Sequence, residues 1–188
     1  AALSDLPLDL PELVDSAART FAAVPGFQAQ QVQDELLGHF LPERLAGSLR
    51  EQGFSAHEVD AVLALQPRRL AEVPRRLQAV RAFAQLPEAE ALAAANKRIG
   101  NILKKADAAD AAVDPARFVE PAEHALWDAM QAAVPQADAR FEAGDYGASL
   151  QALAALRAPV DAFFDHVMVN ADDPALKANR LALLGSLH

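Results

Sequence analysis

AAANKRIGNILKK, residues 93–105, is the stretch that decides the fold. Read at about 100° per residue, six apolar side chains share one arc of a helix of about 100°: Leu92, Ala95, Ile99, Ile102, Leu103 and Ala106. The opposite arc carries four cations and one amide, without an acid among them: Lys97, Arg98, Asn101, Lys104 and Lys105. The stretch predicts a helix that packs one face on a core and presents a positively charged face to solvent.

The composition extends this helical prediction to the whole chain of 188 residues. Hydrophobic residues make up 52% of the chain, aromatic residues only 6%, and there are only 8 glycines. Alanine and leucine, which favour helices, supply most of the apolar content. We therefore expect an all-α fold, a bundle of seven to nine helices joined by short loops.

Positive charge is concentrated in one part of an acidic chain. The net charge is −9, yet nine cations stand against three acids between Gln66 and Lys105, a net charge of +6 in forty residues. The other 148 residues carry eight cations and 23 acids, a net charge of −15. This distribution is typical of a protein that holds one polyanion at one place and repels others. The arginines at 68, 69, 75, 76 and 81 either extend that surface or form a solvated face.

Several classes of function are disfavoured. There is no cysteine, which excludes disulfides and zinc–thiolate sites. The five histidines lack metal-ligand spacing, and there is no glycine-rich phosphate loop or nucleophile motif. We therefore expect no metal site and no catalytic residue in this chain. Without a long apolar run or a signal peptide, we expect a soluble, cytoplasmic protein without a membrane or DNA partner. Because residue 1 is alanine, we also expect a segment of a longer polypeptide.

Apolar spacing and capping signals place the helices along the chain. Pro42 should kink the second of them or mark where two helices meet, and Pro74 should kink the fourth or mark its start. Ser55 and Glu58 form a capping box, and Pro135 should interrupt the sixth. Residues 107–121 should form a surface loop. We expect residues 1–27 to be a linker or the end of a preceding module, and residues 28–188 to form one helical domain. The expected helices span residues 11–22, 28–52, 56–65, 68–85, 87–105, 122–142, 145–157, 159–168 and 174–187.

Three positions depart from the apolar patterns of their helices. Arg180 lies in the middle of the apolar arc of the last helix, so its guanidinium needs a buried carboxylate. Asp161, Asp165 or Asp172 could supply it, which favours a structural ion pair over an RNA contact. Asn96 borders the apolar arc of its helix and is expected to be a buried amide. Gly100 costs about 1 kcal/mol of helix stability, so it should permit close approach of another backbone or of RNA.

Two motifs resemble a known family. Ala95–Lys105 closely resembles the Asn-Lys-Arg…Asn-Ile-Leu helix of helical anticodon-binding domains, and Pro159–Leu184 resembles the end of the same domain. Arginyl-tRNA synthetases share this ending in looser form. The fuller match, which includes Phe40–Leu65, is to the β subunits of bacterial heterotetrameric glycyl-tRNA synthetases. The resemblance covers about residues 28–188.

The resemblance implies a DALR-type domain that grips the anticodon stem and loop of tRNA-Gly. It also implies a partner α subunit that carries most of the glycylation chemistry, so ATP and Mg²⁺ are expected there and no cofactor here. The chain would be part of a ligase without being catalytic itself. Phosphate contacts are expected from Lys97, Arg98, Lys104, Lys105, Arg68, Arg75 and Arg76, and base contacts from Arg98 or Asn101.

Three alternatives remain open. The first is the equivalent domain of arginyl-tRNA synthetase, which the match over residues 40–65 disfavours. The second is a helical protein-interaction or dimerisation module, for which the reversal of charge at Arg98 would leave function intact. The third is an independent enzyme, which the absence of a catalytic constellation disfavours: Asp161 and Asp165 lie one turn apart, but the only neighbouring residue of catalytic type is His166.

Overall fold

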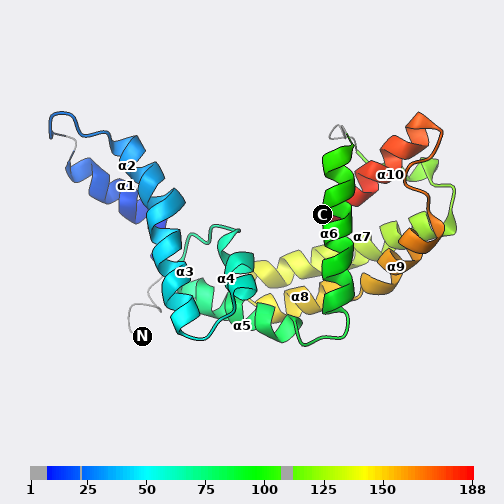
Figure 1. Ribbon diagram of the computed structural model, residues 1–188, viewed down its shortest axis with the longest axis horizontal. Coiled ribbons are helices and arrows are strands. Elements are labelled where there is room, and N and C mark those ends of the chain that lie inside the picture. Colours follow the sequence, from blue (N-terminus) through cyan, green and yellow to red (C-terminus); the bar gives the residue numbers. More distant parts are fainter. Residues whose placement is uncertain (1–7, 22, 107–111) are drawn as a thin grey trace. The chain divides into compact units, whose positions relative to one another are not determined.

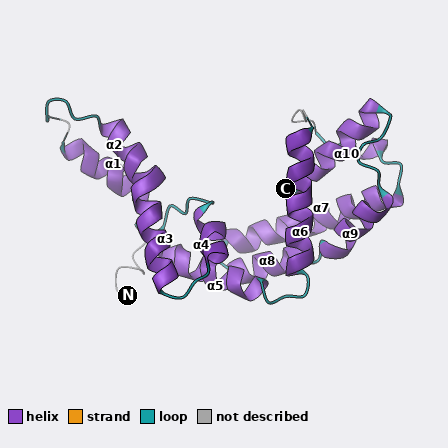
Figure 2. Cartoon of the chain, in the orientation of Figure 1, coloured by secondary structure: helices purple, strands orange, loops and turns teal. Residues whose placement is uncertain are grey.

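The structure is a computed structural model that describes residues 8–21, 23–106 and 112–188, and these residues are predominantly helical (Figures 1 and 2). Over these ranges there is no β-strand, only an isolated antiparallel bridge between Asp9 and Arg69. The all-α fold is thus confirmed. No helix in the same ranges is long and apolar enough to cross a membrane.

The order of the helices follows the order of the apolar patterns in the sequence. The second and third helical segments are continuous through a π turn at Leu36–Phe40, and the number of separate helices in the described chain falls within the seven to nine predicted. The segments are α1 (Leu10–Thr20), α2 (Ala29–Glu35), α3 (Leu41–Glu51), α4 (Ala56–Leu63), α5 (Val73–Phe83), α6 (Ala89–Lys105), α7 (Pro121–Glu142), α8 (Tyr146–Ala154), α9 (Arg157–His166) and α10 (Pro174–Leu187).

The chain divides into two compact units, Ala1–Ala82 and Phe83–His188. This boundary differs from the one expected at residue 27, a prediction that fell partly on residues 1–7 and 22, outside the described ranges. Long-range contacts join the start of the described chain to the rest of the first unit. The Arg68 guanidinium donates to both carboxylate oxygens of Asp9 at 2.8 and 3.1 Å. The Leu10 amide also donates to the Arg68 carbonyl at 2.9 Å. α1 is thereby held within the first unit.

Three prolines affect their helices differently. Pro42 lacks the N–H that an α-helix would use, and the π turn before it lets the helix continue without a break. Pro74 lies in the first turn of α5 and marks its start, one of the two outcomes expected. Pro135 was expected to interrupt α7, and this was wrong, because α7 runs unbroken for 22 residues. Buried Met130, Ala133 and Ala137 hold α7 on both sides of the proline, so tertiary packing compensates for the lost bond.

The predicted capping box at the start of α4 is confirmed. The Glu58 amide donates to Ser55 Oγ at 3.2 Å, and Glu58 Oε2 accepts from the Ser55 amide at 2.7 Å. The same carboxylate accepts from Arg81 Nε at 2.7 Å and Arg81 Nη2 at 2.9 Å. The hydrogen bonds from Arg81 and from the Ser55 amide lower the pKa of Glu58 to about 2. The cap therefore ties the start of α4 to α5.

This shift predicts that the first unit loses stability in acid. Because the folded-state pKa of Glu58 is depressed, its contribution is present above the ordinary pKa of 4.5 and is lost as the pH falls towards 2. Thermal melts at pH 7, 4 and 2 should show the chain losing more stability than Glu58→Gln, which has no titrating group at this position. Parallel pH profiles for the two proteins would contradict the prediction.

The core of the second unit forms where α6, α7, α9 and α10 meet. Leu126, Phe163, Leu183 and Leu184 are fully buried in it, and α6 contributes Ile99 at 2% exposure. Figure 1 shows α7 beside α8 and α9, with α6 and α10 also in this unit. The apolar arc of α6 therefore faces the core as predicted, which leaves its other face outward.

The loop expected at residues 107–121 is partly described. Residues 107–111 lie outside the described ranges. Residues 115–117 form a short 3₁₀ helix, and Val113 packs against the core. The Asp114 amide donates to Asn179 Oδ1 at 2.8 Å, and Asn179 Nδ2 donates back to the Asp114 carbonyl at 3.0 Å. The described part of the loop is thus fixed to α10.

Candidate nucleic-acid interface

The positively charged face of α6 is exposed along its length. All five side chains predicted to face solvent do so, and in the described chain none of the cations among them pairs with a carboxylate. They are Lys97, Arg98, Asn101, Lys104 and Lys105. Their charges are not neutralised by the fold, so they are available to a polyanion.

The arginines of the first unit differ in this respect. Arg68 holds Asp9, and Arg76, only 14% exposed, lies 2.7 Å from a carboxylate oxygen of Glu72. A phosphate would have to compete with those carboxylates. Arg75 is exposed and forms no ion pair with any described residue. A role for Arg68, Arg75 and Arg76 in tRNA binding stays a prediction, and Arg75 has the least competition.

An open pocket of about 590 Å³ lies beside the positive face of α6. Its far wall is formed by Asn170, in the loop after α9, and by the half-buried Lys177 of α10. Neither residue was among the predicted site residues, because Asn170 lies in a loop far from α6 in the sequence and Lys177 is an isolated cation. Among the described residues that line the pocket there is no carboxylate, and its α6 wall consists of Ala94, Lys97, Arg98, Asn101, Ile102, Lys105 and Ala106.

Arg98 is oriented by a neighbouring helix. Its guanidinium carbon lies 4.0 Å from the centre of the Phe164 ring of α9, a cation–π contact. The contact restricts a long and otherwise free side chain while its N–H groups stay exposed to solvent. Less conformational entropy is then lost when Arg98 binds a ligand.

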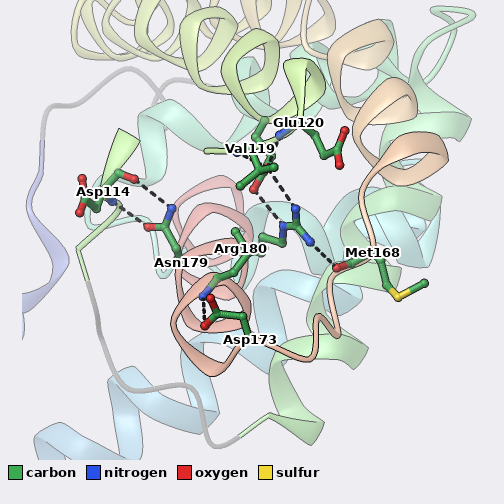
Figure 3. A network of polar contacts seen from close by, with 9 residues as sticks. Asp114, Val119, Glu120, Met168, Asp173, Asn179 and Arg180 are labelled. Carbon is green, nitrogen blue, oxygen red and sulfur yellow. Dashed lines mark hydrogen bonds and ion pairs between the residues drawn. The ribbon is translucent and has the colours of Figure 1, made fainter. Parts of the chain in front are cut away.

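The second unit contains one buried ion pair. Arg180 and Glu123 are 5% and 0% exposed, and Arg180 Nε and Nη2 lie 3.0 and 3.2 Å from the two carboxylate oxygens (Figure 3). The expectation that Asp161, Asp165 or Asp172 would be the partner was wrong. Asp161 instead lies 3.6 Å from Arg157 in the same helix, and Asp165 is exposed.

The ion pair also joins three parts of the second unit. Arg180 Nη1 donates to the Met168 carbonyl at 2.8 Å, and the amides of Val119 and Glu120 donate to Glu123 Oε2 (Figure 3). Burial alone would raise the pKa of Glu123, but the bonds from Arg180 and from these two amides outweigh it, so the pKa is lowered. The carboxylate therefore stays ionised, and α10, α7 and the loop before Asn170 are held together.

His188, the residue after α10, contacts α6 at Asn96 and Gly100. Asn96, expected to be a buried amide, is exposed, and its Oδ1 lies 2.8 Å from His188 Nδ1. A Cβ at Gly100 would lie 3.3 Å from His188 Cε1, so the glycine makes room for the imidazole. The close approach expected at Gly100 was to another backbone or to RNA, and in the structure it is to the side chain of His188.

Comparison with known proteins places these features in a family. The DALR anticodon binding domain family matches residues 92–188, which include α6 from its fourth residue onward and all the described residues that line the pocket. The chain is 61% identical over 186 residues to the glycine--tRNA ligase beta subunit of Dechloromonas aromatica and 62% identical over 184 residues to that of Thiobacillus denitrificans. These alignments cover 98% and 97% of this chain, and 26% of each relative. The chain thus spans about a quarter of the length of these curated relatives.

Proposed function

Since this chain belongs to the DALR anticodon binding domain family, we propose that it holds the anticodon stem and loop of a tRNA on the positive face of α6. The observation that carries this proposal is that Lys97, Arg98, Lys104 and Lys105 are exposed without carboxylate partners in the described chain. Four of the arginines in the same basic region, by contrast, pair with acids.

The names of the relatives direct the proposal to glycine. The matched proteins are named as beta subunits of glycine--tRNA ligase, so the expected ligand is tRNA-Gly and the expected partner is the α subunit of that ligase. In this proposal the chain recognises and positions tRNA in the cytoplasm, while ATP, Mg²⁺ and the glycylation step belong to the catalytic subunit. Binding at the anticodon would place the distant acceptor end through the rigidity of the tRNA.

Electrostatics would supply most of the affinity. Lysines and arginines that neutralise phosphates release counterions, so binding should weaken steeply as salt rises. The acidic remainder of the chain would repel other nucleic-acid segments and limit contact to this face. Base identity would be read by Arg98 or Asn101, because bases in a loop are unstacked and present their edges.

Two other functions are less well supported. An anticodon-binding domain of arginyl-tRNA synthetase would have the same architecture, but the relatives reported above are all glycine--tRNA ligase beta subunits. A protein-interaction module would be expected to bind through apolar surface, whereas α6 presents cations and an amide. It also predicts that Arg98 can be changed without loss of tRNA binding, which makes Arg98 the deciding residue.

The proposal is tested by Arg98→Glu in the complete ligase. We expect about 10- to 100-fold weaker binding of tRNA-Gly, because a phosphate or base contact is replaced by repulsion. Fluorescence anisotropy with tRNA-Gly and a non-cognate tRNA at two salt concentrations measures this. Arg140→Glu is the matched control, since Arg140 is exposed on α7 and forms no ion pair with a described residue. Equal binding by both variants and the unmodified ligase would favour the interaction module.

A further inference from the structure

We propose that the pocket beside α6 binds one unstacked nucleotide of the anticodon loop, with its base between Asn101 and Asn170 and a phosphate on Lys177. This inference rests on the proposed function and assigns a specificity role to two residues outside α6. The pocket has walls from two segments about seventy residues apart in the sequence, α6 on one side and the loop and first turns of α10 on the other.

The two amides are suited to a base and not committed elsewhere. Within the described chain, neither the Asn101 nor the Asn170 side chain makes a hydrogen bond, and both are exposed. Each amide offers two N–H donors and one carbonyl acceptor, which can pair with the edge of a base. A site for phosphate alone would need only cations. The presence of an amide on each wall therefore favours a complete nucleotide.

The rest of the lining suits the other parts of a nucleotide. Ile102 and Ala106 give the α6 wall an apolar surface against which the face of a base can lie. Lys97, Lys105 and Lys177 place positive charge around it, and none of the described lining residues is a carboxylate that would oppose a phosphate. Lys177 is half-buried, so its charge is held near the pocket. RNA-binding proteins recognise loop nucleotides by this combination of base-edge contacts and cations.

The far wall is held in place by the buried ion pair. Asn170 lies two residues after Met168, whose carbonyl accepts from Arg180 Nη1 at 2.8 Å, and Lys177 precedes Arg180 on α10 by almost one turn. Arg180 is in turn fixed to Glu123 of α7. A recognition residue discriminates well when such surrounding contacts fix its backbone. The ion pair thereby positions Asn170 and Lys177 opposite Asn101.

The test compares Asn170→Ala and Lys177→Ala in the complete ligase. Dissociation constants are measured for tRNA-Gly and for the same tRNA with each anticodon nucleotide substituted in turn. For Asn170→Ala we expect discrimination at one anticodon position to fall about 10-fold, because a base contact is lost. For Lys177→Ala we expect all these tRNAs to bind more weakly by the same factor, with the salt dependence of log Kd reduced by about 0.7, because a phosphate contact is lost.

Matched controls separate these effects from general ones. Gln151→Ala removes an exposed amide from α8, and Arg140→Ala removes an exposed charge from α7; both lie outside the pocket. If Asn170→Ala and Lys177→Ala match these controls while Arg98→Glu still weakens binding as expected above, the pocket assignment is wrong and the proposed function stands. If Arg98→Glu also binds normally, both fail. Asn101→Ala provides a second test, since it should relax discrimination at the same position as Asn170→Ala.

Discussion

Arg180→Ala is expected to destabilise the second unit by about 3–5 kcal/mol, because it leaves Glu123 as a buried charge without its partner. Glu123 is fully buried, and both of its oxygens face the guanidinium. Total stabilities of domains are about 5–15 kcal/mol, so this loss would remove a large share. Urea unfolding of the chain, followed by the fluorescence of its single tryptophan, measures it, since Trp127 packs against the core of this unit.

Two control variants separate the effect of breaking the buried ion pair from the effect of removing any arginine. Arg157→Ala removes a 43%-exposed partner of Asp161, and such surface pairs contribute about 0–1 kcal/mol. The double change Arg180→Leu with Glu123→Leu removes both charges, and it should be more stable than Arg180→Ala alone. A loss after Arg180→Ala no larger than that after Arg157→Ala would show that the pair contributes little.

Neutralising three cations of α6 together is expected to lower the affinity for tRNA on the order of 100-fold at 0.1 M salt. The change is Lys97→Gln, Lys104→Gln and Lys105→Gln in the complete ligase. Each lost phosphate contact reduces the slope of log affinity against log salt by about 0.7 to 0.9, so the slope should fall by about two. Titrations at several salt concentrations give the slope directly, and a shared intercept at 1 M salt would show that only phosphate contacts were removed.

A control with the same change in net charge is available. Arg19, Arg50 and Arg140 are exposed and lie on α1, α3 and α7. Replacing all three with glutamine should leave the slope within about 0.3 of its original value, because none belongs to the proposed interface and only cations that contact phosphates contribute to the slope. If the two triple variants lose affinity equally, tRNA responds to the net charge of the ligase and the face of α6 has no special role.

The exposed face of α6 could be predicted because it depends only on the order of residues within this helix. Helical periodicity alone separates Ile99, which is buried, from Lys97 and Arg98, which are exposed. The capping box at Ser55 is local for the same reason, since its two members are three residues apart. Features that depend on the residue pattern of a single helix could therefore be predicted from the sequence.

The remaining features depend on contacts between distant segments. The burial of Arg180 could be predicted from its apolar neighbours on the same helix. Its partner could not, because Glu123 lies 57 residues away, in the first turn of a helix, where acids are common because they interact favourably with the helix dipole. The far wall of the pocket was missed likewise, because nothing near Asn170 in the sequence indicates α6. Pro135 is the opposite case. The local rule that proline interrupts a helix is correct in general, but the packing of α7 against other helices outweighed it here.

The position of Arg180 on α10 also has a consequence for synthesis of the protein. Glu123 leaves the ribosome well before its partner, together with Leu126 and Phe163, whose packing partners Leu183 and Leu184 also lie on α10. A nascent chain that has not reached α10 therefore exposes apolar surface and an unmatched carboxylate, features that attract chaperones and proteases. Translation arrested before Pro174 would yield a fragment that retains the cations of α6. We expect quality control to degrade such fragments before they can sequester tRNA.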